Sequence, residues 1–350
     1  MPPGAPLRSA NPHPLQPARP ITSIAVSRAV TLRNCRRPRI SASLPALSDA
    51  TPQSAAAASA RTEGPSPVII HPAAVVSPQA VIHSGVEIGP FCVVEPGAII
   101  GQNCQLMSGA VVKTGCTIGR DSTLHEGVVV GGVAQHVSPP EPPGRVLIGE
   151  RCTLRENATV HRSMHTAGET RVGNDCYLMA GAHVGHDAVV GNHVILTNNV
   201  LLGGHVRVGE RACLGGAVAV HQHCRIGRLA MVGGCARIVQ DVPPFVLTDG
   251  ESGLIVGLNR IGMRRAGLDR EQQTQLKDAY RLIYRRGLTL TEAVAALEAE
   301  FPAGPAAEFA PFFADTKRGF VQERRGPGRS AIRLHPAADE ETVESKRLAG

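Results

Sequence analysis

The sequence predicts a mainly β protein, in which a parallel β-helix is followed by a small α-helical domain. An aliphatic residue recurs at every sixth position through residues 70–130, 148–160 and 172–238, and a fixed six-residue period indicates a parallel β-helix. A 3.6-residue helical period would scatter these side chains around every face, so an α-helix is excluded there. Aromatic residues make up only 3% of the chain, so the core must be filled by smaller aliphatic side chains.

The repeat also predicts how the turns of the β-helix stack. Three hexads make one triangular turn, so residues 18 apart should lie at the strand spacing of about 4.8 Å. The repeat is interrupted at residues 131–145 and 162–171. Both interruptions are too long for corners and should loop out, and loops on a rigid scaffold often carry function. A flat side of such a prism can pair with copies of itself, which favours a homotrimer.

Most of the nine cysteines follow the repeat. Six of them stand four residues after the repeating aliphatic residue, at a position that otherwise holds alanine: Cys92, Cys104, Cys116, Cys152, Cys176 and Cys224. Free cysteine packs as a small buried hydrophobe, and the chain has no C-x-x-C pair. We therefore expect core positions rather than metal ligands or a redox pair.

The remaining boundaries follow from composition and helix signals. We expect the β-helix over residues 68–244, a helical domain over 245–324 and a disordered tail over 325–350. A helix should begin after Asp269 and end near Arg286, with Gly287 as its stop. The segment 289–292 reads as a capping box for a second helix that runs through Phe301.

The first 67 residues differ in composition from the rest. Residues 1–68 contain eight arginines, no lysine and two acidic residues, and most of the net charge of +7 lies there. An Arg-rich, Ser-rich and acid-poor leader is typical of a transit peptide, and we expect a mitochondrial location, with a chloroplast as the alternative. A disordered tail is the other interpretation of this segment.

Composition also excludes two classes of function. The body of the chain is nearly neutral and has few aromatics, so nucleic-acid binding is not indicated. No run of 18 apolar residues occurs, so no membrane-spanning helix is expected.

Polar residues gather in the late turns of the predicted β-helix. The 18-residue rule places them in two adjacent columns: Asp187, His205 and His223 in one, and His186, Gly204 and Gln222 in the other. A histidine oriented by a carboxylate is an effective general base. A glycine can present its backbone N–H to a developing oxyanion without a side chain in the way.

Two other interpretations of these columns stay open. The His-x-x-His spacing at His183 and His186 superficially suggests zinc, but residues three apart on a β-coil should point in different directions. Zinc held across subunits by three histidines, as in γ-class carbonic anhydrases, is one alternative. The other is a catalytically retired trimer whose polar stacks only line the seam between subunits.

The motifs in these turns resemble one enzyme family. The segments 178–187, 203–205, 219–222, 232–244 and 312–319 are similar to UDP-N-acetylglucosamine O-acyltransferases, which catalyse the first step of lipid A biosynthesis, and the resemblance covers about residues 70–321. It implies a left-handed β-helix trimer with active sites between subunits, and no metal or organic cofactor. It also implies transfer of a (3R)-3-hydroxyacyl group from acyl carrier protein to the 3-hydroxyl of UDP-N-acetylglucosamine.

The same resemblance implies roles for individual residues. His186 would be the general base, Asp187 would orient its imidazole, and the Gly204 amide would stabilise the oxyanion. Substrate-binding positions would be His183, His205, His221, Gln222, Gln135, Asn198, Asn259, Arg265 and Gly234. Among these, Asn198, Asn259 and Arg265 match nucleotide or donor contacts, and Gly234 matches the position that sets acyl-chain length.

The sequence departs from the family pattern at substrate contacts. The loop that usually reads Gln-Asp-Leu-Lys here has His136 and Ser138 in place of the two charged residues. Ile261 replaces an acidic residue, and Ala266 replaces the second of two arginines. We therefore predict an active acyltransferase with weakened or altered substrate binding. Acyl-chain length and the leader's cleavage site do not follow from the sequence.

Overall fold

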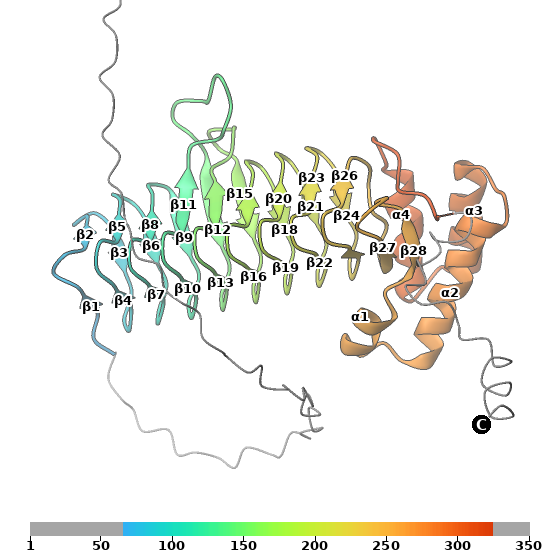
Figure 1. Ribbon diagram of the computed structural model, residues 1–350, viewed down its shortest axis with the longest axis horizontal. Coiled ribbons are helices and arrows are strands. Elements are labelled where there is room, and N and C mark those ends of the chain that lie inside the picture. The colour runs from blue at the N-terminus through green and yellow to red at the C-terminus, as the bar shows by residue number, and fades with distance from the viewer. Residues whose placement is uncertain (1–65, 325–350) are drawn as a thin grey trace, which may run out of the picture. The chain divides into compact units, whose positions relative to one another are not determined.

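The computed structural model describes residues 66–324, and the backbone forms a parallel β-helix that leads into a group of short helices (Figure 1). Its strands form three sheets of eleven, nine and eight strands. Every pairing within them is parallel apart from the final β27–β28 pair. The fold is the left-handed β-helix with a C-terminal helical region that was predicted.

As far as β26, each sheet takes every third strand of the chain, and β27 and β28 then extend the first sheet. The first sheet contains β1 (Ile69–Ile70), β4 (Glu87–Ile88), β7 (Gln105–Leu106), β10 (Thr123–Leu124), β13 (Thr153–Leu154), β16 (Tyr177–Leu178), β19 (Ile195–Leu196), β22 (Cys213–Leu214), β25 (Met231–Val232), β27 (Val246–Thr248) and β28 (Ile255–Leu258). The second contains β2 (Val75–Val76), β5 (Val93–Val94), β8 (Val111–Val112), β11 (Val129–Gly132), β14 (Thr159–His161), β17 (His183–Val184), β20 (Leu201–Leu202), β23 (Ala219–Val220) and β26 (Arg237–Ile238). The third contains β3 (Val81–Ile82), β6 (Ile99–Ile100), β9 (Cys116–Ile118), β12 (Arg145–Ile148), β15 (Glu169–Val172), β18 (Val189–Val190), β21 (Arg207–Val208) and β24 (Arg225–Ile226).

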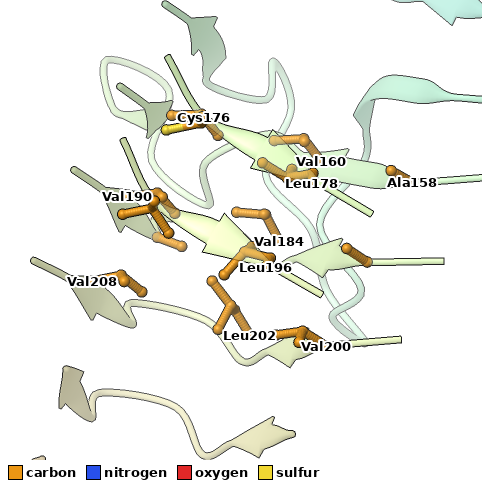
Figure 2. Close-up of a cluster of buried hydrophobic side chains, with 14 of the residues drawn as sticks. Ala158, Val160, Cys176, Leu178, Val184, Val190, Leu196, Val200, Leu202 and Val208 are labelled. Carbon is orange, nitrogen blue, oxygen red and sulfur yellow. The ribbon is translucent and has the colours of Figure 1, made fainter. Parts of the chain in front are cut away.

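The six-residue repeat is the source of the core. Most of the repeating aliphatic residues are buried, and those of neighbouring turns, such as Leu178 and Leu196, are register partners in one sheet. Figure 2 shows several of these side chains together inside the coil. The six cysteines four residues further on are also buried, as predicted. Burial raises the pKa of Cys104 to about 11 and that of Cys116 to about 12, which agrees with inert core thiols.

Both interruptions of the repeat leave the coil as loops (Figure 1). They change the register between turns, because Val129 pairs with Thr159 and Thr159 pairs with His183, instead of with the residue 18 positions further on. After the second loop the spacing of 18 returns, as in the pairing of His183 with Leu201. The 18-residue rule therefore holds through the turns that carry the histidine columns.

The helical region follows the sequence signals closely. It contains α1 (Arg260–Arg265), α2 (Arg270–Arg285), α3 (Leu290–Glu300), a 3-10 turn (Pro305–Glu308) and α4 (Phe309–Ala314). Asp269 and Thr289 cap α2 and α3 through complete capping boxes, so both predicted helix starts are confirmed. Gly287 follows the C-cap of α2 with φ +71°.

The junction with the β-helix lies slightly later than expected. The parallel strand β27 extends the first sheet past residue 244, and Phe245 is buried in the same cluster as Phe309. The ion pair between Arg228 and Glu308 joins the last turns of the coil to the 3-10 turn. No helix in residues 66–324 is long and apolar enough to cross a membrane. The predicted leader, apart from its last two residues, and the predicted C-terminal tail lie outside the described residues.

Candidate active site

A cavity of about 680 Å³ lies along the second sheet, over β17, β20, β23 and β26. It brings together six of the predicted site residues: His183, His186, Gly204, His221, Gln222 and Gln135. Five of these come from three successive turns of the coil, whereas Gln135 comes from the first loop. Both His183 and His186 border the cavity, but His183 is not among the residues whose potential ligand atoms lie together with that of His186.

His186 and Asp187 form a hydrogen-bonded pair at the edge of this cavity. The Nδ1 atom of His186 lies 2.8 Å from Oδ2 of Asp187. Because an ionised carboxylate only accepts hydrogen bonds, Nδ1 carries the proton and Nε2 keeps its lone pair. The side chains are 16% and 10% exposed, so the pair is shielded from bulk water yet open to the cavity. This is the arrangement of an oriented general base.

Several groups hold the Asp187 carboxylate in place. Ser163 donates its hydroxyl to Oδ1, and the backbone N–H of Met164 lies 3.0 Å from Oδ2. The Asp187 amide in turn donates to Oγ1 of Thr170 at 2.8 Å. Burial by itself would raise the pKa of Asp187, but the hydrogen bonds from Ser163, His186 and Met164 outweigh it, so this pKa lies below its ordinary value. The carboxylate is therefore ionised at neutral pH.

Gly204 lies directly against the imidazole of His186. A Cβ added at Gly204 would be 2.5 Å from both Cε1 and Nε2 of that ring, so only glycine fits there. The Gly204 carbonyl accepts from the amide of His223, whereas its own N–H has no hydrogen-bond partner among residues 66–324. The column of His186 and Gly204 predicted from the spacing of 18 is thus confirmed. It presents an unpaired backbone donor beside the base.

Two further histidines extend the polar wall of the cavity. The ring of His161 stands edge-on to His183 with centroids 4.9 Å apart, and Nδ1 of His183 lies 2.8 Å from Oγ1 of Thr159. Burial, together with the nearby His183 and His186, lowers the pKa of His161 to about 4. Burial also lowers the pKa of His183. These two rings are therefore neutral at pH 7, and the cation that lines the cavity is Arg237.

The other predicted site residues lie outside this cavity. His205 stacks on His223 with centroids 4.5 Å apart, and its Nε2 lies 3.8 Å from Asp187. Asn198, Gly234 and Arg265 are exposed. The Asn259 side chain caps α1, because it accepts from the Gly262 amide and donates to the Leu229 carbonyl.

Sequence reasoning missed the residues that surround Asp187 and His183. Ser163 and Thr170 lie within the second interruption, and Thr159 and His161 precede it. The 18-residue spacing between turns cannot place these residues, because strand partners are 24 residues apart across this loop. The available signal in the sequence was the second interruption of the repeat, because a loop at that point returns to the coil beside Asp187.

One group near the base has atoms suitable for a metal ion. His186, Asp187 and His205 each offer one ligand atom, and these atoms lie within 4.8 Å of one another. However, Oδ2 of Asp187 already accepts from His186 and from the Met164 amide. A metal ion would have to replace the contact that orients the base, so these residues fit a hydrogen-bonded pair better than a metal site.

The fold and this site define the class of protein. Residues 97–132 and 169–204 match the family model described as bacterial transferase hexapeptide (six repeats). A hexapeptide-repeat β-helix with the His186–Asp187 pair next to Gly204 places the chain among the hexapeptide-repeat acyltransferases.

Closer comparisons identify the family within that class. Residues 241–321 match the second domain of UDP-N-acetylglucosamine O-acyltransferase. An acyl-[acyl-carrier-protein]–UDP-N-acetylglucosamine O-acyltransferase from Anaeromyxobacter sp. is 39% identical over 196 residues, which cover 55% of this chain and 76% of that protein. The chain belongs to the UDP-N-acetylglucosamine O-acyltransferase family.

Solved structures agree with this assignment. The UDP-N-acetylglucosamine acyltransferase of Francisella novicida superposes with a TM-score of 0.70 at 30% identity, over 77% of this chain and all of that one. The Bacteroides fragilis enzyme gives 0.70 at 34% identity, over 73% of this chain and all of that one. The Arabidopsis enzyme gives 0.60 at 30% identity, again over 73% of this chain and all of that one.

Proposed function

We propose that this protein transfers a (3R)-3-hydroxyacyl group from acyl carrier protein to the 3-hydroxyl of UDP-N-acetylglucosamine, the first step of lipid A biosynthesis. The observation that carries the proposal is the His186–Asp187 pair beside the unpaired Gly204 amide, in a member of this acyltransferase family. The test is incubation of the purified chain with UDP-N-acetylglucosamine and a series of hydroxyacyl carrier proteins. Mass spectrometry should find the O-acylated sugar nucleotide, and absence of product with every donor would contradict the proposal.

The chemistry follows from the order of these groups. Nε2 of His186 takes the proton of the sugar hydroxyl as the oxygen attacks the thioester carbonyl carbon. Asp187 stabilises the imidazolium that forms, and the Gly204 N–H donates to the oxyanion of the tetrahedral intermediate. When the intermediate collapses, the C–S bond breaks and the imidazolium returns its proton to the carrier's thiolate. The histidine then starts the next cycle neutral.

The cavity has room for the acceptor and for part of the donor. A volume of about 680 Å³ lies within the usual range of small-molecule sites. His183, His221 and Gln222 supply hydrogen-bonding groups for a sugar, and Leu201 and Val220 supply apolar surface for the acyl chain. We assign His183, His221, Gln222 and Gln135 to substrate binding on this basis.

A homotrimer accounts for the predicted residues that lie outside the cavity. Asn198, Gly234 and Arg265 are exposed in the single chain, and Leu201 at the cavity is 50% exposed. A second copy packed against this side would cover Leu201 and would bring such residues toward a shared cleft. Light scattering should therefore give three times the mass of one chain. A monomeric mass at micromolar concentration would contradict the trimer.

Altered substrate contacts should show in the Michaelis constant. His136 and Ser138 hydrogen-bond to each other within the exposed loop, and Ile261 is 56% exposed. These positions lack the charges that the family pattern has, whereas the groups around His186 are complete. Relative to a family member with the Gln-Asp-Leu-Lys loop, we expect a raised KM for the sugar nucleotide and a similar kcat.

The leader supports delivery to an organelle. Its eight arginines and lack of lysine are typical of transit peptides, and a plant enzyme is among the structural relatives. We propose the mitochondrion, with the chloroplast as the alternative. A fluorescent protein fused after residue 67 should be imported into one of these organelles. Fluorescence that stays in the cytosol would contradict the proposal.

The zinc alternative rests on His186, Asp187 and His205. Metal analysis of the purified chain separates it from the acyltransferase, because a carbonic-anhydrase-like protein would carry about one zinc per site and would hydrate carbon dioxide. The acyltransferase proposal predicts full acyl transfer after treatment with a chelator. A retired trimer would show neither activity.

A further inference from the structure

The second loop of the coil is built around Ser163, which touches the acid of the catalytic pair and does not border the cavity. Ser163 is 0% exposed, and its hydroxyl donates to Oδ1 of Asp187. The same oxygen accepts from the His165 amide at 2.9 Å. The hydroxyl also lies 3.3 Å from the carbonyl oxygen of His165, but the ionised carboxylate, at the shorter contact, is the stronger acceptor for its single proton.

Each oxygen of the Asp187 carboxylate has its own hydrogen-bond donors. Oδ2 lies next to His186 and the Met164 amide, whereas Ser163 provides the only hydrogen bond to Oδ1 from within residues 66–324. A partial rotation of the carboxylate about its Cβ–Cγ bond would move one oxygen away from Ser163 and the other away from Nδ1 of His186. Ser163 thus acts against that rotation.

Both loops contribute to the position of Ser163. The Gly144 amide, at the end of the first loop, donates to the Ser163 carbonyl at 3.2 Å. A Cβ at Gly144 would be 2.7 Å from Cβ of Ser163, and a Cβ at Gly168 would approach Oγ of Ser163 even more closely. Gly144 and Gly168 therefore both leave space for the Ser163 side chain. A side chain that only filled the loop would not require two neighbouring glycines.

We propose that Ser163 is a positioning residue for the acyl transfer. It holds the Asp187 carboxylate in the rotamer that keeps the His186 proton on Nδ1, so that Nε2 faces the acceptor hydroxyl. Its effect passes entirely through Asp187. The inference rests on the proposed function, since it concerns the base of that reaction.

The kinetic consequence separates positioning from binding. Ser163 does not line the cavity, so Ser163→Ala should lower kcat by about 10- to 100-fold, the loss expected for one hydrogen bond to a charged group, with KM unchanged. The control is Thr166→Ala in the same loop, where an exposed hydroxyl donates to the Pro142 carbonyl and does not contact Asp187. That variant should keep the kcat of the wild type.

The pH profile gives a second readout. Two titratable groups face Asp187: His186 on the same turn of the coil and His205 on the next turn. His165 faces His205 from the second loop. Loss of the Ser163 donor leaves the charge of the carboxylate less compensated, so Asp187 stabilises the protonated form of the His186 base more strongly. The acidic limb of kcat should therefore move to higher pH in Ser163→Ala and should stay in place in Thr166→Ala.

The decisive experiment is a double-mutant cycle with Asp187→Asn. If Ser163 acts through the carboxylate, Ser163→Ala should cost little further kcat in the Asp187→Asn background. An equal fold-loss in both backgrounds, a change in KM alone, or an unchanged kcat would each overturn the proposal. If Ser163→Ala does not fold, Ser163→Cys keeps the shape with a weaker donor, and the same cycle applies to it. A wild-type chain without acyl transfer would instead count against the proposed function.

Discussion

The imidazole of His186 occupies the space that a side chain at position 204 would need, so only glycine fits at that position. An added Cβ would be 2.5 Å from Nε2 and from Cε1 of the ring. The two residues come from neighbouring turns, and the amide of His205 donates to the carbonyl of His186 at 2.9 Å, which fixes the spacing between those turns. Backbone geometry therefore sets the distance between the base and the Gly204 amide.

Gly204→Ala should remove most of the activity without unfolding the chain. The methyl group forces His186 away from Asp187 and from the acceptor, and misplacement of a reacting group by about 1 Å can cost on the order of 100-fold in rate. Steady-state kinetics should show this loss in kcat, and the melting temperature should fall by only a few degrees, about the effect of 1 kcal/mol.

Gly216→Ala is the matched control for that variant. A Cβ at Gly216 meets nothing nearer than 3.6 Å, and its φ is not in the left-handed region. It should keep the fold and most of kcat. Equal activity in Gly204→Ala and Gly216→Ala would show that contact with His186 has no catalytic importance.

Acidification should weaken the fold through the partly buried His161 and His183 before it protonates Asp187. The pKa of His161 is about 4 in the fold and about 6.5 in the unfolded chain. Between these values the unfolded state binds the proton more readily, so the free energy of unfolding rises with pH. The contribution of His161 is complete above pH 6.5 and is lost as the pH falls toward 4.

Urea titrations at pH 7.5 and pH 5 measure this effect. His161→Gln should reduce the difference in unfolding free energy between the two pH values by about 1–2 kcal/mol, after discounting for partial exposure. The remaining slope belongs in part to His183, whose pKa is lowered as well. An identical pH dependence in wild type and variant would refute the assignment of a neutral, partly buried His161.

Gly234 should limit the length of the acyl chain. It is exposed on the coil next to Gly216, and a Cβ there would lie 3.2 Å from the Gly216 carbonyl oxygen, so larger side chains are expected to project outward into the space above. Gly234→Leu should shift the preference toward shorter donors by about 10-fold or more in kcat/KM, the usual effect of one to two methylenes in an apolar pocket. Competition between donors of different length measures this ratio, and an unchanged preference would contradict the role of Gly234.

The β-helix and the base could be predicted because the repeat is regular where they lie. The spacing of 18 between residues 172 and 240 places Gly204 on His186 and His223 on His205 without any coordinates. Cysteine burial followed from the same periodicity, as did the core. Each of these predictions required only the position of the residue within the six-residue repeat.

The prediction failed where the register changes. Ser163 and Thr170 reach Asp187 from a loop that no period describes, so the groups that hold the acid were missed. Asn259 was assigned to ligand binding by resemblance, and the structure adds a capping role that was not predicted: its side chain accepts from the Gly262 amide and donates to the Leu229 carbonyl. An asparagine just before a helix is a common N-cap, and that local signal was present in the sequence.

The measurement closest to the central claim is kcat for acyl transfer by His186→Ala, compared with His193→Ala. His193 lies in the next hexad, and its ring turns toward Asp175 instead of the cavity. Loss of a general base should lower kcat by about 100- to 10,000-fold, whereas His193→Ala should stay near the wild-type rate, and both should retain the wild-type mass by light scattering. A His186→Ala protein of that mass with a rate within about threefold of the wild type, too small for loss of a general base, would contradict the account.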